Sequence, residues 1–116
     1  MSYDMAIWDG RRPDSDDEAI EIFGELAERY LENDEVPAAP KITRFVDALV
    51  ARWGDLDDTG DAPWATGGTG DASGPVLNVN IRYGDDRVDE VSASVAELAE
   101  EHGLVCYDLQ QERLRP

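Results

Sequence analysis

The sequence has almost no cysteine or histidine. Cys106 is the single cysteine, so no internal disulfide can form, and His102 is the single histidine. One cysteine and one histidine cannot build an ordinary zinc site, which needs four protein ligands or three and a water. No nucleophilic residue has a recognisable base beside it. We therefore expect no metal and no cofactor, and we expect the protein not to be an enzyme.

Long apolar runs are also missing. No segment approaches the roughly 20 apolar residues of a membrane-spanning helix. The opening residues 1–5 lack a basic region followed by an apolar one, so we expect no secretory signal and a cytoplasmic protein. Hydrophobic residues make up 41% of the chain and recur in periodic segments, which is typical of a folded protein. With 116 residues, we expect a single domain over 1–116.

Basic residues are scarce. Ten Lys and Arg face 27 Asp and Glu, which gives a net charge of −17, and Lys41 is the only lysine. Such a surface repels nucleic acid and anionic membranes and attracts basic proteins or cations. The alternative is adaptation to high salt, because concentrated ions screen the repulsion between carboxylates.

The periodicity of the apolar residues predicts an α+β fold. Alternation predicts a strand over 3–8, and Ser15 to Glu18 form a capping box for the helix that follows. The expected elements are a strand at 3–8, a helix from Ser15 to Leu31, a helix at 40–53, a strand at 77–83, a helix at 88–101 and a strand at 104–108. The order β-α-α-β-α-β predicts a small sheet of three to four strands with the helices packed on one face. Asn78 and Asn80 indicate that the other face is open, and a three-layer arrangement is the alternative.

A loop at 54–75 is acidic and rich in glycine. Five of the ten glycines lie between Gly60 and Gly74. The segment 55–61 is similar to a calcium loop, but Thr66 stands where that loop needs a bidentate glutamate. Gly67 to Gly70 has neither the spacing nor the lysine of a phosphate-binding loop. Both segments are therefore interpreted as solvated loop.

Two acidic groups are the candidates for binding a partner. On the first helix, glutamates recur at intervals of three or four residues on the face opposite the apolar stripe. The loop contributes aspartates, and Trp64 is a candidate apolar anchor, since tryptophan is enriched in binding hot spots. The alternative for Trp64, and for Trp8, is a place in the core. The candidate partner-binding residues are Glu21, Glu25, Glu28, Glu32, Asp55, Asp57, Asp58, Asp61 and Trp64.

Several short segments carry a family resemblance. They are the opening Met-Ser-Tyr-Asp-Met-Ala-Ile-Trp-Asp-Gly, the Ser15–Glu18 capping box, Pro63-Trp64, the segment 70–75 and the closing Glu-His-Gly-Leu-Val-Cys-Tyr-Asp at 101–108. Together they resemble a family of small, acidic, uncharacterised actinobacterial proteins over nearly the whole chain. That family in turn resembles the immunity proteins of polymorphic toxin systems. The resemblance implies no catalytic residue.

Three hypotheses of function follow. The first is a non-enzymatic protein-binding domain, most concretely an immunity protein or inhibitor that binds a basic toxin, because an acidic surface speeds encounter with a cationic partner. The second is a salt-adapted domain whose acidity has no partner. The third is a small enzyme that uses carboxylates with a divalent cation, which requires several acids gathered in one concave site.

Overall fold

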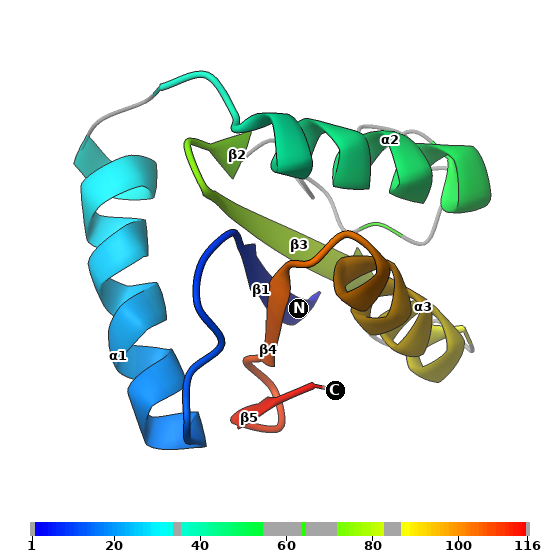
Figure 1. Ribbon diagram of the computed structural model, residues 1–116. Helices are drawn as coiled ribbons and strands as arrows, with labels where there is room; N and C mark the ends of the chain where they lie inside the picture. The colour runs from blue at the N-terminus through cyan, green and yellow to red at the C-terminus, as the bar shows by residue number, and fades with distance from the viewer. Residues whose placement is uncertain (1, 34–35, 55–63, 65–71, 83–86, 116) are drawn as a thin grey trace.

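A five-stranded antiparallel sheet forms the centre of the molecule (Figure 1). The computed structural model describes residues 2–33, 36–54, 64, 72–82 and 87–115. Within them the strand order is β2-β3-β1-β4-β5, with β1 in the middle and two-residue strands at both edges. The strands are β1 (Ser2–Trp8), β2 (Ala72–Ser73), β3 (Val76–Arg82), β4 (Val105–Asp108) and β5 (Arg113–Leu114).

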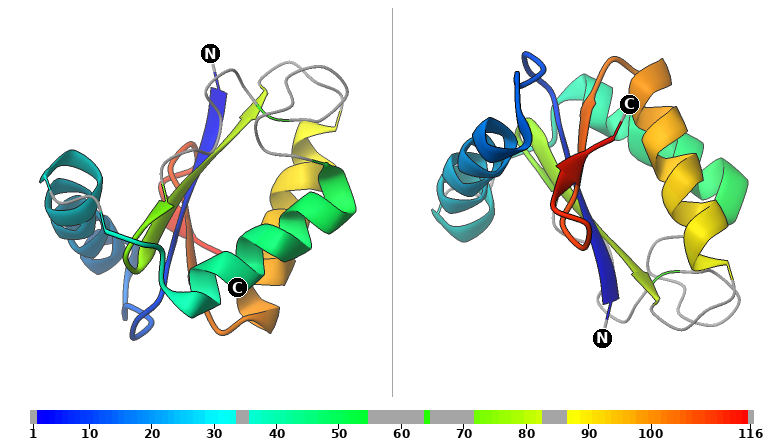
Figure 2. Two further views of the ribbon diagram at one scale, coloured as in Figure 1. Left: turned by 90° about the horizontal axis from the view of Figure 1, so that it is seen from above. Right: turned by 90° about the horizontal axis from the view of Figure 1, so that it is seen from below.

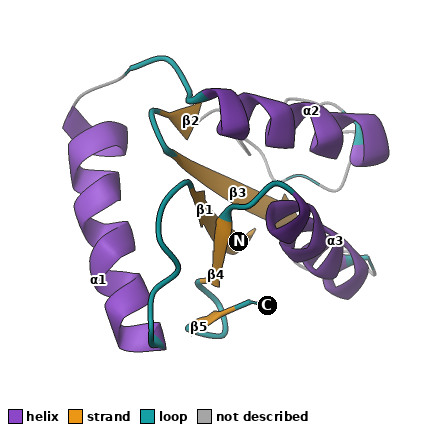
Figure 3. Cartoon of the chain, viewed as in Figure 1, coloured by secondary structure: helices purple, strands orange, loops and turns teal. Residues whose placement is uncertain are grey.

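In the described parts of the chain, three α-helices and one π-helix connect the strands (Figure 3). They are α1 (Asp16–Leu26), the π-helix η1 (Ala27–Asn33), α2 (Pro40–Trp53) and α3 (Val88–Glu101). The α+β class and the order β-α-α-β-α-β are confirmed. No helix in the described ranges has both the length and the apolar character needed to cross a bilayer.

The helices do not all pack on one face, and this part of the sequence prediction is wrong. Figure 2 shows α1 on one side of the sheet and α2 with α3 on the other. The reason lies in the strands, since all four residues of β4 are buried and β1 is buried on both faces from Met5 to Trp8. A strand that is apolar on both sides needs a cover on each.

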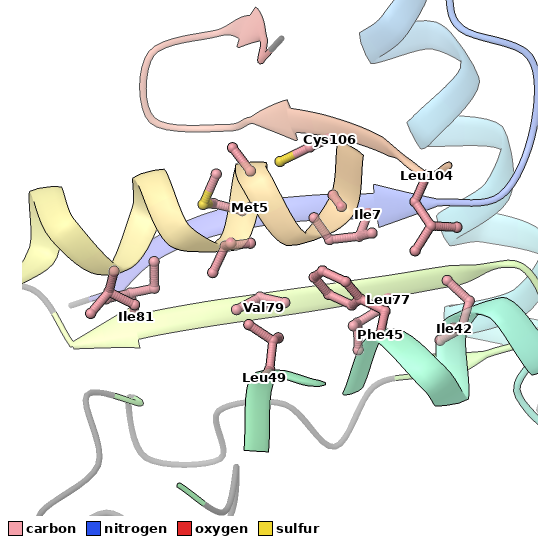
Figure 4. Close-up of a cluster of buried hydrophobic side chains, with 14 of the residues drawn as sticks. Met5, Ile7, Ile42, Phe45, Leu49, Leu77, Val79, Ile81, Leu104 and Cys106 are labelled. Atoms are coloured by element: carbon pink, nitrogen blue, oxygen red, sulfur yellow. The ribbon is translucent and has the colours of Figure 1, made fainter. Parts of the chain in front are cut away.

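Each face of the sheet therefore has its own core. Met5 and Ile7 point toward α2 and α3, where they meet Phe45, Leu49 and other side chains drawn in Figure 4. Ala6 and Trp8 point the other way, toward α1, and Trp8 stacks on Phe23 with ring centroids 6.2 Å apart. Both faces of β1 therefore belong to a core.

The face that carries α1 is only partly open. Strand register places Asp4 opposite Asn80 and Ala6 opposite Asn78 on this face. Asp4, Asn78 and Asn80 are half-buried, whereas Ala6 is fully covered. Asn78 and Asn80 of β3 therefore lie at one end of this face, and α1 covers the other end.

Helix α1 begins as the sequence predicts and ends differently. The Ser15 hydroxyl accepts a hydrogen bond from the Glu18 backbone N–H at 3.1 Å, which caps the helix. The Glu18 carboxylate pairs with the Arg11 guanidinium at 3.0 Å. The α-helix stops at Leu26, and the chain continues to Asn33 as a π-helix.

Candidate partner-binding site

The charged residues of α1 are all acidic. Its 11 residues include five acids and no base. Glu21 and Glu25 are exposed, and neither forms an ion pair with any residue in the described ranges. Glu28 is exposed in η1, while the side chain of Glu32 is outside the description. Since like charges four residues apart cost a few tenths of a kcal/mol per pair, burial of the opposite face must stabilise this helix.

Helix α3 has as many acidic residues as α1, but its surface lacks a large exposed apolar side chain. The 14 residues of α3 also include five acids and no base. Of the large apolar side chains that the described residues leave exposed, none belongs to α3, whereas α1 contributes Ile20, which is 42% exposed. Acidic groups beside an exposed apolar side chain are what a binding surface needs, because a contact gains free energy from buried apolar area as well as from charge. This combination occurs on α1.

Trp64 is a core residue, so its predicted role as an exposed anchor is wrong. Its side chain is fully buried, and its backbone forms an isolated antiparallel bridge with Ile81. The indole N–H donates to the Gly54 carbonyl at 3.2 Å, so the polar edge of the ring is satisfied inside the protein. A buried, hydrogen-bonded indole gains more from the core than from solvent.

The aspartates of the predicted loop site, Asp55, Asp57, Asp58 and Asp61, lie outside the described residues, as does Gly67–Gly70. Trp64 belongs to the core under α2 and α3, on the opposite side of the sheet from α1. The structure therefore does not bring Trp64 together with Glu21 and Glu25.

A pocket that the sequence did not predict lies beside α1. Its volume is about 430 Å³, and it separates the first turns of α1 from the hairpin that joins β4 to β5. It is lined by Asp16, Asp17, Ile20, Tyr107, Leu109 and Glu112. The Asp16 carboxylate accepts a hydrogen bond from the Leu114 backbone N–H at 2.8 Å, which ties the helix to the hairpin.

The hairpin is fixed from inside by a buried carboxylate. Asp108 is fully buried, and its Oδ1 accepts from the backbone N–H groups of Gln110 and Gln111 at 3.0 and 2.9 Å. Its Oδ2 accepts from the Tyr3 hydroxyl at 2.5 Å and from Arg115 Nη1 at 3.0 Å. Both oxygens are thus saturated by protein donors, which suits a structural role.

Near Asp108, the Tyr3 phenol and the Cys106 thiol are held in their neutral forms. Burial, followed by the hydrogen bond to Asp108 and its charge, raises the pKa of Tyr3 above its usual range. Burial raises the pKa of Cys106 from 9.0 to about 12. A buried thiol that keeps its proton at neutral pH is a poor nucleophile.

The remaining candidate groups have structural partners. His102 follows α3, where its Nδ1 lies 2.8 Å from the Leu98 carbonyl oxygen and its ring meets Phe45 edge-on. Within the part of the chain that the structure describes, no group of three or more His, Cys, Asp or Glu side chains could hold a metal ion.

Comparison of the chain with protein-family models, curated proteins and solved structures finds no match. The resemblance to small acidic actinobacterial proteins, and through them to immunity proteins of polymorphic toxin systems, therefore stays a prediction. The candidate site rests on geometry and charge alone.

Proposed function

We propose that this protein is a non-enzymatic acidic domain that binds a basic protein through the outer face of α1. Its most concrete form is a cytoplasmic immunity protein or inhibitor that covers the cationic surface of a toxin. One observation carries the proposal: α1 combines unpaired exposed carboxylates with the exposed side chain of Ile20 and a neighbouring pocket. The net charge of −17 adds long-range attraction, which raises the rate of encounter with a cationic partner.

A second candidate function is a salt-adapted domain without a partner. The equal acid content of α1 and α3 favours it, because adaptation to salt spreads charge over the whole surface. The two functions differ in one consequence. If α1 binds a partner, removing charges from α1 should affect binding more than removing the same number elsewhere. If the acidity is an adaptation to salt, only the total number of charges should matter.

The chain offers a matched pair of variants that separates the two functions. Glu21→Gln with Glu25→Gln removes two exposed carboxylates four residues apart on α1, and Glu97→Gln with Glu101→Gln does the same on α3. Each protein is immobilised and used to capture proteins from cells of the source organism at about 50 mM and about 500 mM salt. Mass spectrometry then compares the retained proteins.

The proposal expects one basic protein that is retained by the wild type and by the α3 variant, and that the α1 variant retains several-fold less. Retention should weaken at the higher salt, because screening shortens the Debye length to about 4 Å. Equal losses with the two variants would refute the α1 site and favour the salt-adapted domain.

A further inference from the structure

The pocket beside α1 has walls that are fixed without a ligand. One wall is the first turns of α1, and the other is the β4–β5 hairpin. The bond from Leu114 N–H to Asp16 connects the walls, and Asp108 holds the hairpin turn through its two backbone bonds. A preformed cavity of about 430 Å³ requires little rearrangement before it binds a ligand.

The lining of the pocket is acidic and apolar, and contains no basic residue. Asp16, Asp17 and Glu112 supply three carboxylates, and Ile20 and Leu109 supply apolar surface. The N-terminal end of α1 adds a positive charge equivalent to roughly half an elementary charge. Three carboxylates exceed it, so the pocket has a net negative charge. A cation with an apolar stem matches this lining. A metal ion does not, because the described residues contain no cluster of three or more His, Cys, Asp or Glu side chains that could hold one.

Tyr107 gives a second and independent indication of a ligand. Its side chain is 2% exposed, and it lines the pocket. Among the residues described, its hydroxyl has no hydrogen-bond partner, and it is not one of the fully buried unpaired atoms, so the phenol oxygen reaches the space of the pocket while the rest of the side chain is covered. Burial, and then the charges of Glu112, Asp16 and Asp17, raise the pKa of Tyr107. The phenol oxygen therefore lies near the carboxylates as a neutral, unused acceptor.

We propose that this pocket binds an arginine side chain of the basic partner. The inference rests on the proposed function and names the group that the α1 face recognises. A guanidinium carries five N–H donors in one plane, so it can reach the phenol oxygen of Tyr107 and carboxylates on both walls at once. Its methylene stem packs on Ile20 and Leu109. A lysine ammonium has three donors at one point and cannot span both walls equally well.

The test uses arginine capped as N-acetyl-arginine N-methylamide, with the matching capped lysine, in a titration followed by ¹H–¹⁵N NMR. The capped arginine should shift the amide signals of Asp16, Asp17, Leu109 and Glu112 in the wild type. Tyr107→Phe removes the phenol oxygen and should weaken the binding about ten- to a hundredfold, the usual effect of losing one hydrogen bond to a charged group. Glu112→Gln, on an exposed residue, should weaken it by a similar factor and gives a second variant if Tyr107→Phe fails to fold.

A fluorescent deca-arginine peptide separates this inference from the proposed function. Weaker peptide binding by the α1 variant than by the α3 variant supports the function. Arginine binding in the pocket is refuted, while the function stands, if the α1 variant binds the peptide more weakly but capped arginine shifts no pocket amide. It is also refuted if Tyr107→Phe and Glu112→Gln bind the peptide like the wild type. Equal binding of capped lysine refutes the choice of arginine. Equal effects of the α1 and α3 variants on the peptide refute the function itself.

Discussion

Replacing Asp108 with alanine should remove a large part of the stability of this protein. The carboxylate is fully buried and accepts four hydrogen bonds, from Tyr3, Gln110, Gln111 and Arg115. Alanine leaves the Tyr3 hydroxyl without this acceptor. It also leaves the Arg115 guanidinium without its carboxylate, although that side chain is only 15% exposed. The perturbation therefore creates an uncompensated buried charge as well as lost bonds.

The magnitude follows from these partners. Removing one member of a buried ion pair costs about 3–5 kcal/mol. The two turn N–H groups are half-buried and can reach water, so they add little to this figure. For 116 residues a typical total stability is roughly 6–17 kcal/mol. We therefore expect Asp108→Ala to lower the free energy of unfolding by about 4 kcal/mol, a quarter or more of the total.

Urea unfolding followed by the fluorescence of the three tryptophans measures this loss. Tyr3→Phe is the control, because it removes one of the four bonds and should cost about 2 kcal/mol, the typical value for a hydrogen bond to a charged group. The loss in Asp108→Ala should change little between low and high salt, since a buried pair is poorly screened. A loss below about 1 kcal/mol, or one no larger than that of Tyr3→Phe, would refute the reasoning.

Three further predictions concern charge, protonation and backbone strain. Glu21→Gln with Glu25→Gln should raise the free energy of unfolding by a few tenths of a kcal/mol at low salt, and thermal melts at about 1 M NaCl should show no gain. The pKa of Cys106 is about 12 in the folded protein against 9.0 when free, so the unfolded chain loses this proton first as the pH rises. Stability should therefore fall by up to about 1.4 kcal/mol per pH unit above pH 9, and urea titrations should show a smaller fall for Cys106→Ala. Glu112 has a φ of 53°, in the left-handed region. Glu112→Gly should be up to about 1 kcal/mol more stable than Glu112→Ala in the same assay, because only glycine relieves the strain. Equal stability of the two variants would contradict this.

Local rules explain why much of the fold could be predicted. Alternation in 3–8 predicted a strand, and β1 runs from Ser2 to Trp8. Pro40 and Gly54 mark the ends of the second helix, and α2 begins at Pro40 and is capped by Gly54 with a φ of 102°. These signals depend on residues close together in the chain, so one sequence contains them completely.

The side of the sheet on which α1 packs could not be read from its own apolar stripe. An apolar stripe predicts that one face of a helix is buried, but not the surface against which it packs. The available signal was β4, where Val105, Cys106 and Tyr107 form an unbroken apolar run that needs cover on both faces. The pocket was equally hidden, because Asp17 and Tyr107 are 90 residues apart in the chain and meet only because α1 packs on the sheet beside the β4–β5 hairpin.

The core and the candidate pocket share the β4–β5 hairpin, and this decides which variants can test binding. Asp108 fixes the turn from inside through Gln110 and Gln111, and the next residue, Glu112, lines the pocket with its backbone at a φ of 53°. Strain of this kind persists only where surrounding contacts impose it, and the bonds from Asp108 to the two residues before Glu112 hold this turn. An Asp108 variant would therefore lose stability and pocket shape together and could not separate them. Glu112→Gln and Glu112→Gly do separate them: the first removes charge at constant backbone, whereas the second removes charge and strain. If arginine binding depends on the carboxylate, both variants should bind arginine more weakly than the wild type, although only the glycine variant relieves the backbone strain.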